Sequence, residues 1–192
     1  MSCQGVRERV GGGRRALVAV VGVVAVALTG CAAGFSGKGA AGHSAGRAEE
    51  DGSIPDNTSI ALTETGHAAL RKLDPALLAA VRAAAVDAGA AGIELRVTSG
   101  WRSKAYQQRL LDEAVARFGS VEEARRFVST PETSEHVVGK AIDIGPTDAA
   151  DWLTRHGADY GLCQTYANEM WHFELLTTPG GLCPLQRNDA SG

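Results

Sequence analysis

The sequence contains few aromatic residues and no hydrophobic run long enough to cross a membrane. Aromatic residues make up 5% of the 192 positions while glycine alone fills 24, so small side chains must form much of any core. The longest apolar run, residues 16–28, falls short of the roughly 20 residues that a transmembrane helix needs. No internal repeat is visible. With 44% hydrophobic residues, the chain can still build one domain with its own core.

The apolar run near the N-terminus follows four arginines, at positions 7, 9, 14 and 15. A basic segment, a short apolar segment and small residues at a cleavage point are typical of a signal peptide, which we place at residues 1–30. The segment Leu28-Thr29-Gly30-Cys31 resembles the bacterial lipobox, in which the cysteine is acylated and becomes the mature N-terminus. The alternative is an ordinary signal peptide that is cut near Ala33. Both Sec and twin-arginine export stay open.

The mature chain also lacks a basic cluster. Four arginines and one glutamate leave with residues 1–30, so the formal net charge changes from −3 to −6. Nucleic acid is therefore not expected as a partner, and no protein partner is implied. Residues 31–56 are rich in glycine, alanine and serine without periodicity, and we expect a flexible tether there. We expect the folded domain at residues 57–185 and a disordered tail at residues 186–192.

Cysteines are scarce, and their distribution fits an exported protein. Cys3 leaves with the signal peptide and Cys31 carries the lipid, so Cys163 and Cys183 remain as a pair. An even remainder outside the cytoplasm favours a disulfide, which would stabilise the fold by about 3 kcal/mol. The alternative is that one of the two binds metal, although their separation is far from a CxxC spacing.

The pattern of helix caps and alternating segments predicts an α+β fold. Asp74 followed by Pro75 starts a helix that ends near Gly89. Residues 103–118 and 147–156 are also expected to be helical, and Ser120 begins a short helix between them. Segments 93–97, 140–144 and 170–176 alternate or are apolar and are expected to be strands. Because the strands cluster late in the chain, a small antiparallel sheet flanked by helices is the favoured architecture.

Two histidines and an aspartate form a candidate metal site. His136 and Asp143 lie seven residues apart, and Gly139 between them allows the chain to fold back. His172 lies on the last expected strand. Two histidines and one carboxylate with an open fourth position are a common catalytic zinc set, although the donors also permit other divalent metals. Each residue alone has a simpler explanation, such as a turn-capping aspartate or a structural histidine.

Glu169 and Arg102 are candidate catalytic residues beside that site. Glu169 precedes His172 by three residues, so it would face the opposite side of an ideal strand. It must therefore lie on a bend before the strand, where it could take a proton from the attacking water. Arg102 follows a Ser-Gly turn and could stabilise an oxyanion. Taken alone, each could equally be a surface charge.

Three ordered motifs carry a resemblance to a known family. They are Ser99-Gly100-Trp101-Arg102-Ser103 with Gln107, Ser134-x-His136-x-x-Gly139-x-Ala141-x-Asp143, and Glu169-x-Trp171-His172. Together they resemble the zinc D-alanyl-D-alanine carboxypeptidases of the VanY type and their VanX dipeptidase relatives. The resemblance covers roughly residues 70–176. Met170 stands where many relatives have proline, and residues 162–166 replace an Arg-Tyr-Pro stretch that is common in the family.

The resemblance implies a fold, a cofactor and roles for these residues. The fold would be that of the zinc D-Ala-D-Ala peptidases, which is Hedgehog-like, with one Zn²⁺ held by His136, Asp143 and His172. Glu169 would be the base and Arg102 the oxyanion-stabilising residue. Ser134, Ser99 and Gln107 would line the substrate pocket.

The resulting functional hypothesis is a D,D-carboxypeptidase that removes the terminal D-Ala from peptidoglycan stem peptides. It would be anchored to the membrane through lipidated Cys31 and would face the cell wall. The same site could instead serve a peptidoglycan endopeptidase or a D-Ala-D-Ala dipeptidase, although a cytoplasmic dipeptide would not require export. A non-catalytic wall-binding module is the alternative from another class. Glu169 distinguishes it from an enzyme, because a binding module needs no base.

Overall fold

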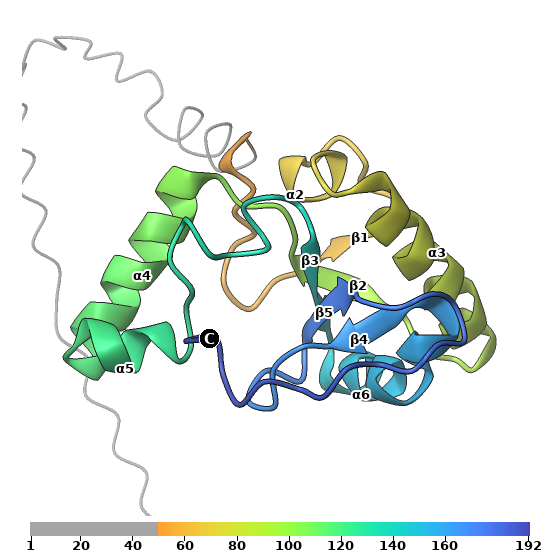
Figure 1. Cartoon of the computed structure of the whole chain (residues 1–192). Coiled ribbons are helices and arrows are strands. Elements are labelled where there is room, and N and C mark those ends of the chain that lie inside the picture. Colours follow the sequence, from red (N-terminus) through yellow and green to blue (C-terminus); the bar gives the residue numbers. More distant parts are fainter. Residues whose placement is uncertain (1–49) are drawn as a thin grey trace, which may run out of the picture. The chain divides into compact units, whose positions relative to one another are not determined.

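The computed structural model describes residues 50–192 (Figure 1). The predicted signal peptide, Cys31 and the tether up to residue 49 lie outside the described residues. The elements, in chain order, are β1 (Ile60–Ala61), α2 (Ala68–Arg71), α3 (Pro75–Ala90), β2 (Arg96–Ser99), α4 (Lys104–Phe118), α5 (Val121–Arg125), β3 (Ala141–Gly145), α6 (Thr147–His156), the 3₁₀ helix η1 (Gly157–Tyr160), β4 (Leu162–Gln164) and β5 (His172–Leu175).

A five-stranded sheet in the order β1-β2-β3-β5-β4 forms the centre of the fold, and every neighbouring pair is antiparallel. The predicted α+β class with a small antiparallel sheet is therefore confirmed. The strand β3 is buried along its whole length. Its alternation sends Ile142 and Ile144 into the main core, while Asp143 points to the opposite face.

The helices begin and end where local side chains satisfy their free backbone groups. Asp74 Oδ1 accepts the backbone N–H groups of Ala76 and Leu77 at the start of α3. The hydroxyl of Ser103 caps α4, and Gly119 ends it in the left-handed conformation with φ of 86°. Ser120 Oγ accepts the N–H of Glu123 at the start of α5. The predicted helices at these positions are confirmed.

The helices α3 and α6 cover one face of the sheet and form the main core with it (Figure 1). Phe173 on β5 and Ile142 on β3 are fully buried in this layer. The helices α4 and α5 lie apart from it and pack on each other through a small cluster of Leu111, Ala114 and Ala124. The site residues of β3 and β5 therefore face away from the layer formed by α3 and α6.

Two predicted strands begin later than the alternation suggested. The strand β2 starts at Arg96 rather than at residue 93, because the N–H of Ile93 bonds back to Ala88 O and completes the end of α3. Similarly, β5 starts at His172 rather than at residue 170. The elements β1, α2, β4 and η1 were not predicted, because segments of two to four residues carry too little periodicity.

Two assignments outside the expected domain are wrong for the residues that the structure describes. Residues 50–56 were assigned to the flexible tether, yet Ile54 lies in the core and Asp51 pairs with Arg109 at 2.7 Å. The tail, residues 186–192, was expected to be disordered, yet Arg187 forms a parallel bridge to Tyr166. Both segments dock through several long-range contacts, which leave no periodic signal in the sequence. Among the described residues, no helix is both long and apolar enough to cross a membrane.

Candidate metal centre and active site

The sheet register brings together the residues that the sequence analysis proposed as metal ligands. Asp143 on β3 is the direct cross-strand partner of His172 on β5. His136 reaches them from the loop before β3, where Gly139 turns the chain at φ of 76° and its carbonyl accepts the N–H of Asp74. A Cβ at Gly139 would lie 2.5 Å from the carbonyl oxygen of Lys72, so only glycine fits there.

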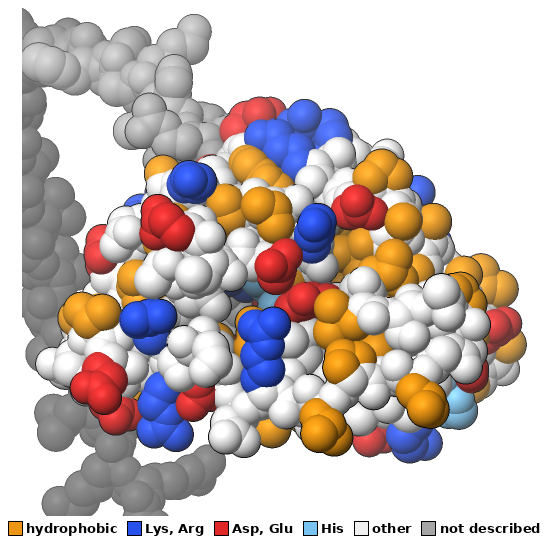
Figure 2. Space-filling view, in the orientation of Figure 1, with side chains coloured by type: hydrophobic (Ala, Val, Ile, Leu, Met, Phe, Trp, Pro, Cys, Tyr) orange, Lys and Arg blue, Asp and Glu red, His pale blue; other side chains and the backbone are white. Residues whose placement is uncertain are grey.

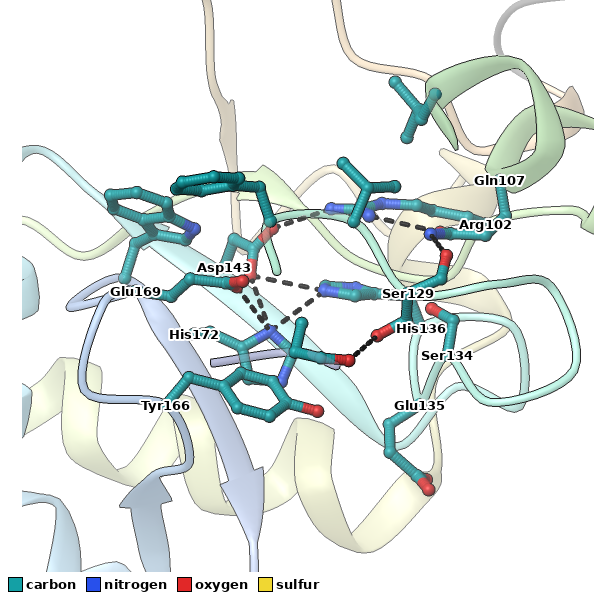
Figure 3. A pocket seen from close by; sticks show the side chains of 15 residues that line it. Arg102, Gln107, Ser129, Ser134, Glu135, His136, Asp143, Tyr166, Glu169 and His172 are labelled. Carbon is teal, nitrogen blue, oxygen red and sulfur yellow. Dashed lines mark hydrogen bonds and ion pairs between the residues drawn. The ribbon is translucent and has the colours of Figure 1, made fainter. Parts of the chain in front are cut away.

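Three donor atoms converge at this point (Figure 3). Asp143 Oδ1 lies 3.3 Å from His136 Nε2 and 3.2 Å from His172 Nδ1. The two nitrogens are 3.2 Å apart. One ligand atom from each residue thus falls within 4.8 Å of the others, and all three residues are buried. The residues that were predicted to bind one ion are placed so that they can do so.

The outer hydrogen bonds of the histidines orient lone pairs towards the centre. His136 Nδ1 lies 2.8 Å from the carbonyl oxygen of Gly100, which can only accept, so the proton is on Nδ1 and Nε2 is free to bind metal. Within residues 50–192, the buried Asp143 Oδ1 has no hydrogen-bond partner. Two imidazole nitrogens and a carboxylate oxygen that converge in a buried site are a donor set that fits a metal ion.

Glu174 was missed by the sequence analysis and supports His172 from behind. Its Oε1 lies 3.0 Å from His172 Nε2, which leaves Nδ1 as the nitrogen that faces the centre. Burial acts to raise the pKa of Glu174, but the hydrogen bond with His172 outweighs it and lowers that pKa, so Glu174 accepts the proton. Residues two apart on a strand share a face, and that spacing was the available signal.

The bend predicted before the last strand is present, and it carries Glu169 to the site. Glu169 Oε2 lies 3.8 Å from His172 Nδ1, and the side chain is buried. Its Oε1 has no hydrogen-bond partner among the described residues. Burial, helped by the Asp143 carboxylate and opposed by His172, raises the pKa of Glu169 to about 7. A carboxylate in this state can exchange a proton near neutral pH.

The ionisable ligands influence one another strongly. Burial, reinforced by the Arg102 guanidinium, lowers the pKa of His136 to about 4. Burial also acts to lower the pKa of His172, but the neighbouring carboxylates of Asp143 and Glu174 outweigh it and raise that pKa to about 9. Burial acts to raise the pKa of Asp143, but His136, His172 and Arg102 together hold it well below its usual range. Asp143 is therefore an anion at the centre of the group.

Arg102 is held in place by three side chains. Its Nη2 lies 2.8 Å from Asp143 Oδ2, the oxygen of Asp143 that faces away from the histidines. Its Nε donates to Ser99 Oγ at 2.7 Å and its Nη1 to Gln107 Oε1 at 3.2 Å. Ser99 and Gln107 were predicted to contact substrate, and the structure places both against this guanidinium. Substrate contact by either residue stays a prediction.

A small pocket opens over the candidate metal centre. Its volume is about 220 Å³, and its lining includes Arg102, Gln107, Ser134, Tyr166, Glu169 and Trp171. Ser134, which was predicted to line the pocket, does so and is buried. Figure 2 shows histidine at the bottom of a hollow near the middle of this face, with acidic and basic side chains around it. The hollow gives a ligand access to the buried centre.

The cysteine pair lies away from the metal centre. Cys163 on β4 and Cys183 form a disulfide in the structure. The group of described residues that could hold a metal ion contains neither cysteine. The alternative that one of them binds this metal is therefore wrong.

The comparisons with known proteins agree with this site. The family model described as VanY, D-alanyl-D-alanine carboxypeptidase, matches residues 70–177. A D-alanyl-D-alanine carboxypeptidase of Enterococcus faecalis is 30% identical over 114 residues, which cover 46% of this chain and 42% of that protein. The chain therefore spans less than half the length of this curated relative.

Solved structures show the same fold. A mutant of the vancomycin-resistance D,D-pentapeptidase VanY with Zn(II) is 26% identical at a TM-score of 0.50, over 53% of this chain and 71% of that chain. VanYB with D-alanine-D-alanine is 26% identical at a TM-score of 0.51, over 53% and 70%. The D,D-dipeptidase VanXYg, with a D-Ala-D-Ala phosphinate analogue, is 24% identical at a TM-score of 0.52, over 68% and 61%. The last of these supports the fold alone.

Proposed function

This chain belongs to the VanY family of D-alanyl-D-alanine carboxypeptidases, and on that basis we propose that it is a zinc-dependent D,D-carboxypeptidase acting on peptidoglycan stem peptides. The reaction would remove the terminal D-Ala. The observation that carries the proposal is the convergence of His136 Nε2, Asp143 Oδ1 and His172 Nδ1, with the Glu169 carboxylate 3.8 Å from His172 Nδ1.

The three converging residues would hold one Zn²⁺ ion. Each histidine directs one ring nitrogen to the centre, and Asp143 Oδ1 offers the third donor. The ion, when bound, supplies a Lewis acid that polarises the scissile carbonyl and lowers the pKa of water. This donor set, with room for a further ligand on the pocket side, is that of catalytic rather than structural zinc.

Glu169 and Arg102 would perform the remaining chemistry. Glu169 takes a proton from the water that attacks the carbonyl carbon and then delivers a proton to the leaving amine of D-Ala. The guanidinium of Arg102 borders the same pocket and stabilises the negative charge that develops on the carbonyl oxygen. Ser99, Gln107 and Asp143 fix its orientation, so little reorganisation is needed during the reaction.

We also propose that the protein is exported and lipid-anchored at Cys31, facing the cell wall. The support is the basic and apolar N-terminal sequence with its lipobox-like end, together with a cysteine pair that suits an oxidising compartment. Mass analysis of the N-terminal peptide from cell membranes tests the anchor, because the thioether lipid adds a fixed mass at Cys31. An N-terminus at Ala33 or Ala32 without lipid would contradict it.

The activity is tested by incubating the zinc-loaded chain with uncross-linked pentapeptide muropeptides and weighing the products. We expect a loss of one alanine mass. Loss of two alanines would instead indicate a dipeptide-releasing enzyme, and broken cross-links an endopeptidase. Bound zinc without any cleavage would indicate the non-catalytic wall-binding module.

The role of Glu169 is tested separately. Glu169→Gln should retain zinc and lose roughly 10²- to 10⁴-fold in kcat, because it removes the proton acceptor and leaves the ligands in place. Glu113→Gln, which changes an exposed carboxylate on α4, is the matched control. A Glu169→Gln protein that binds zinc and keeps full activity would show that Glu169 is not the base.

A further inference from the structure

The C-terminal strap, defined here as residues 183–190, crosses from the edge of the sheet to the end of α5 (Figure 1). It begins at the disulfide between Cys183 and Cys163. Further along, Arg187 N donates to Thr165 O at 2.9 Å and Ala167 N donates to Arg187 O at 2.8 Å. The strap is thereby paired in parallel with the segment that follows β4.

The far end of the strap is fixed to the end of α5 and to the residues that follow it. Asp189 Oδ2 lies 3.1 Å from Arg126 Nε, at the end of α5. The N–H of Ala190 donates to Arg126 O at 3.3 Å, and the hydroxyl of Ser129 donates to Ala190 O at 3.4 Å. The strap therefore joins the segment that follows β4 to the end of α5, where Asn168 Nδ2 also donates to Arg126 O at 2.9 Å.

The bridge places Ala190 in the wall of the small pocket, together with Ser129, Tyr166 and Glu169. At about 220 Å³, this pocket lies below the roughly 300–1,000 Å³ of sites that bind drug-sized molecules. It has room for a small terminal residue and little more.

A larger cavity of about 630 Å³ lies beside the small pocket. The two share Arg102, Leu110, Asp143 and Trp171 in their walls, so they meet next to the metal centre. Residues 54–59 and Tyr106 also line the larger cavity, and none of the strap residues 183–190 does. A long substrate can extend through this cavity, whereas the strap borders the small pocket.

We propose that the strap determines specificity by closing the small pocket on the α5 side. The substrate then ends in the small pocket, while its longer part lies in the larger cavity. A chain that continues past the scissile bond on the α5 side would collide with Ala190 and the backbone that holds it. The strap thus favours substrates with a free terminus over cross-linked ones. This inference rests on the proposed peptidase function.

The test compares two substrates, a stem pentapeptide with a free terminus and the same peptide extended by one glycine beyond the terminal D-Ala. For the full chain, we expect kcat/KM to be at least about tenfold higher for the free-ended peptide. Ending the chain after Asn188 removes Asp189 and Ala190 but keeps the pairing of Arg187. This variant should cleave the extended peptide at least about tenfold better than the full chain, with unchanged zinc content.

Two point variants test the same proposal without shortening the chain. Ala190→Trp narrows the small pocket and should raise KM for the free-ended peptide with zinc still bound. Asp189→Asn removes the ion pair with Arg126 and should shift selectivity in the same direction as the truncation. Asp151→Asn, which removes an exposed ion pair with Arg155 on α6, is the matched control and should leave selectivity unchanged.

The proposal would be overturned if the truncated and Asp189→Asn proteins both kept the selectivity of the full chain, or if the full chain cleaved both peptides equally. Failure of the proposed function looks different. In that case the zinc-loaded full chain would cleave neither peptide.

Discussion

At the scale of single residues, the candidate centre depends on which nitrogen of each histidine carries a proton. Gly100 O fixes the tautomer of His136, and Glu174 fixes that of His172. The two supports differ in kind, because one is a neutral carbonyl and the other is a carboxylate. The carboxylate increases the basicity of its histidine and so strengthens it as a ligand.

Replacing Glu174 should therefore weaken metal binding. We expect Glu174→Gln and Glu174→Ala to lower the zinc affinity by roughly 10- to 100-fold, with the larger loss for alanine. Competition with a chelating dye measures the affinity directly. Raising free zinc should restore activity if Glu174 acts only through His172. Glu113→Gln should bind zinc as the unchanged chain does, and an unaltered affinity in Glu174→Ala would contradict the role.

The candidate ligands, which the fold brings together, could be named from the sequence, whereas the groups that support them could not. His136, Asp143, Glu169 and His172 lie in segments whose spacing and alternation are visible along the chain. The support from Gly100 is a backbone carbonyl 36 positions away, which no side-chain pattern encodes. Similarly, the resemblance named Ser99 and Gln107 as substrate-pocket residues, but only the folded chain places them on the guanidinium of Arg102.

At the scale of elements, the close approach of β2 to the segment of α2 positions His136. Trp101 N donates to Ala69 O at 2.8 Å, and Gly100 sits directly over that carbonyl. A Cβ on Gly100 would lie 2.2 Å from Ala69 O, a backbone atom that cannot yield easily. The carbonyl of Gly100 is also the hydrogen-bond partner of His136 Nδ1.

Two glycine substitutions should have opposite effects on stability. Gly100→Ala should lower the free energy of unfolding by about 1–3 kcal/mol through overpacking and should weaken zinc binding by displacing the Gly100 carbonyl. Gly89→Ala, inside α3 with open space around it, should raise stability by about 0.4–1 kcal/mol. Urea unfolding measures the stability of both variants, and zinc titration measures metal binding. Equal stabilities for the two variants would contradict the steric argument.

Helices were easier to predict than strands, for a local reason. The caps Asp74, Ser103 and Ser120 lie within three residues of the N–H groups they accept, so a short sequence window contains both partners. The strand β4 has three residues, and its partners on β5 are Leu175, Glu174 and Phe173, beyond the short window that contains a helix cap. Such a segment becomes a strand because of its partner, which a local pattern does not show.

At the scale of the whole molecule, three long-range connections hold the ends of the described chain. They are the disulfide between Cys163 and Cys183, the ion pair between Arg126 and Asp189, and the ion pair between Asp51 and Arg109. Each connection ties one end of the described chain to the body of the fold. These ends include residues 50–56 and 186–192, which were expected to be flexible or disordered.

Loss of the disulfide should lower global stability. The bond closes a loop with a sequence separation of 20, which corresponds to about 3 kcal/mol in the chain-entropy account. We expect reduction, or the double change Cys163→Ser with Cys183→Ser, to lower Tm while zinc content stays the same. Calorimetry with and without reductant measures the difference. A serine double variant as stable as the oxidised chain would contradict this prediction.

The Asp51–Arg109 pair should make stability depend on pH. Burial acts to raise the pKa of Asp51, but hydrogen bonds from Arg109 and Ser53 outweigh it and lower that pKa. Because the pKa of Asp51 is lower in the folded chain than in the unfolded chain, its ionisation stabilises the fold. This contribution is complete above the unfolded-state pKa of about 3.9 and is lost as the pH falls through the folded-state pKa. Arg109 is half exposed, so the contribution should be at most about 1 kcal/mol.

The corresponding variant is Asp51→Asn. Its free energy of unfolding should fall below that of the unchanged chain at pH 7, and the gap should close in acid. Asp56→Asn, an exposed neighbour, should show no gap at either pH. Denaturant unfolding at pH 7 and in acid measures the difference in free energy of unfolding between the variant and the unchanged chain. A difference that grew in acid would contradict the lowered pKa of Asp51.

The position of β5 has a consequence for how the protein is made. This strand is the last of the five in sequence, yet it lies inside the sheet between β3 and β4 and carries His172. A chain emerging from a ribosome therefore lacks the strand between β3 and β4 until residues 172–175 have appeared. The same delay withholds His172 from the candidate metal centre. A product that is interrupted before β5 can therefore neither complete this sheet nor assemble the candidate centre.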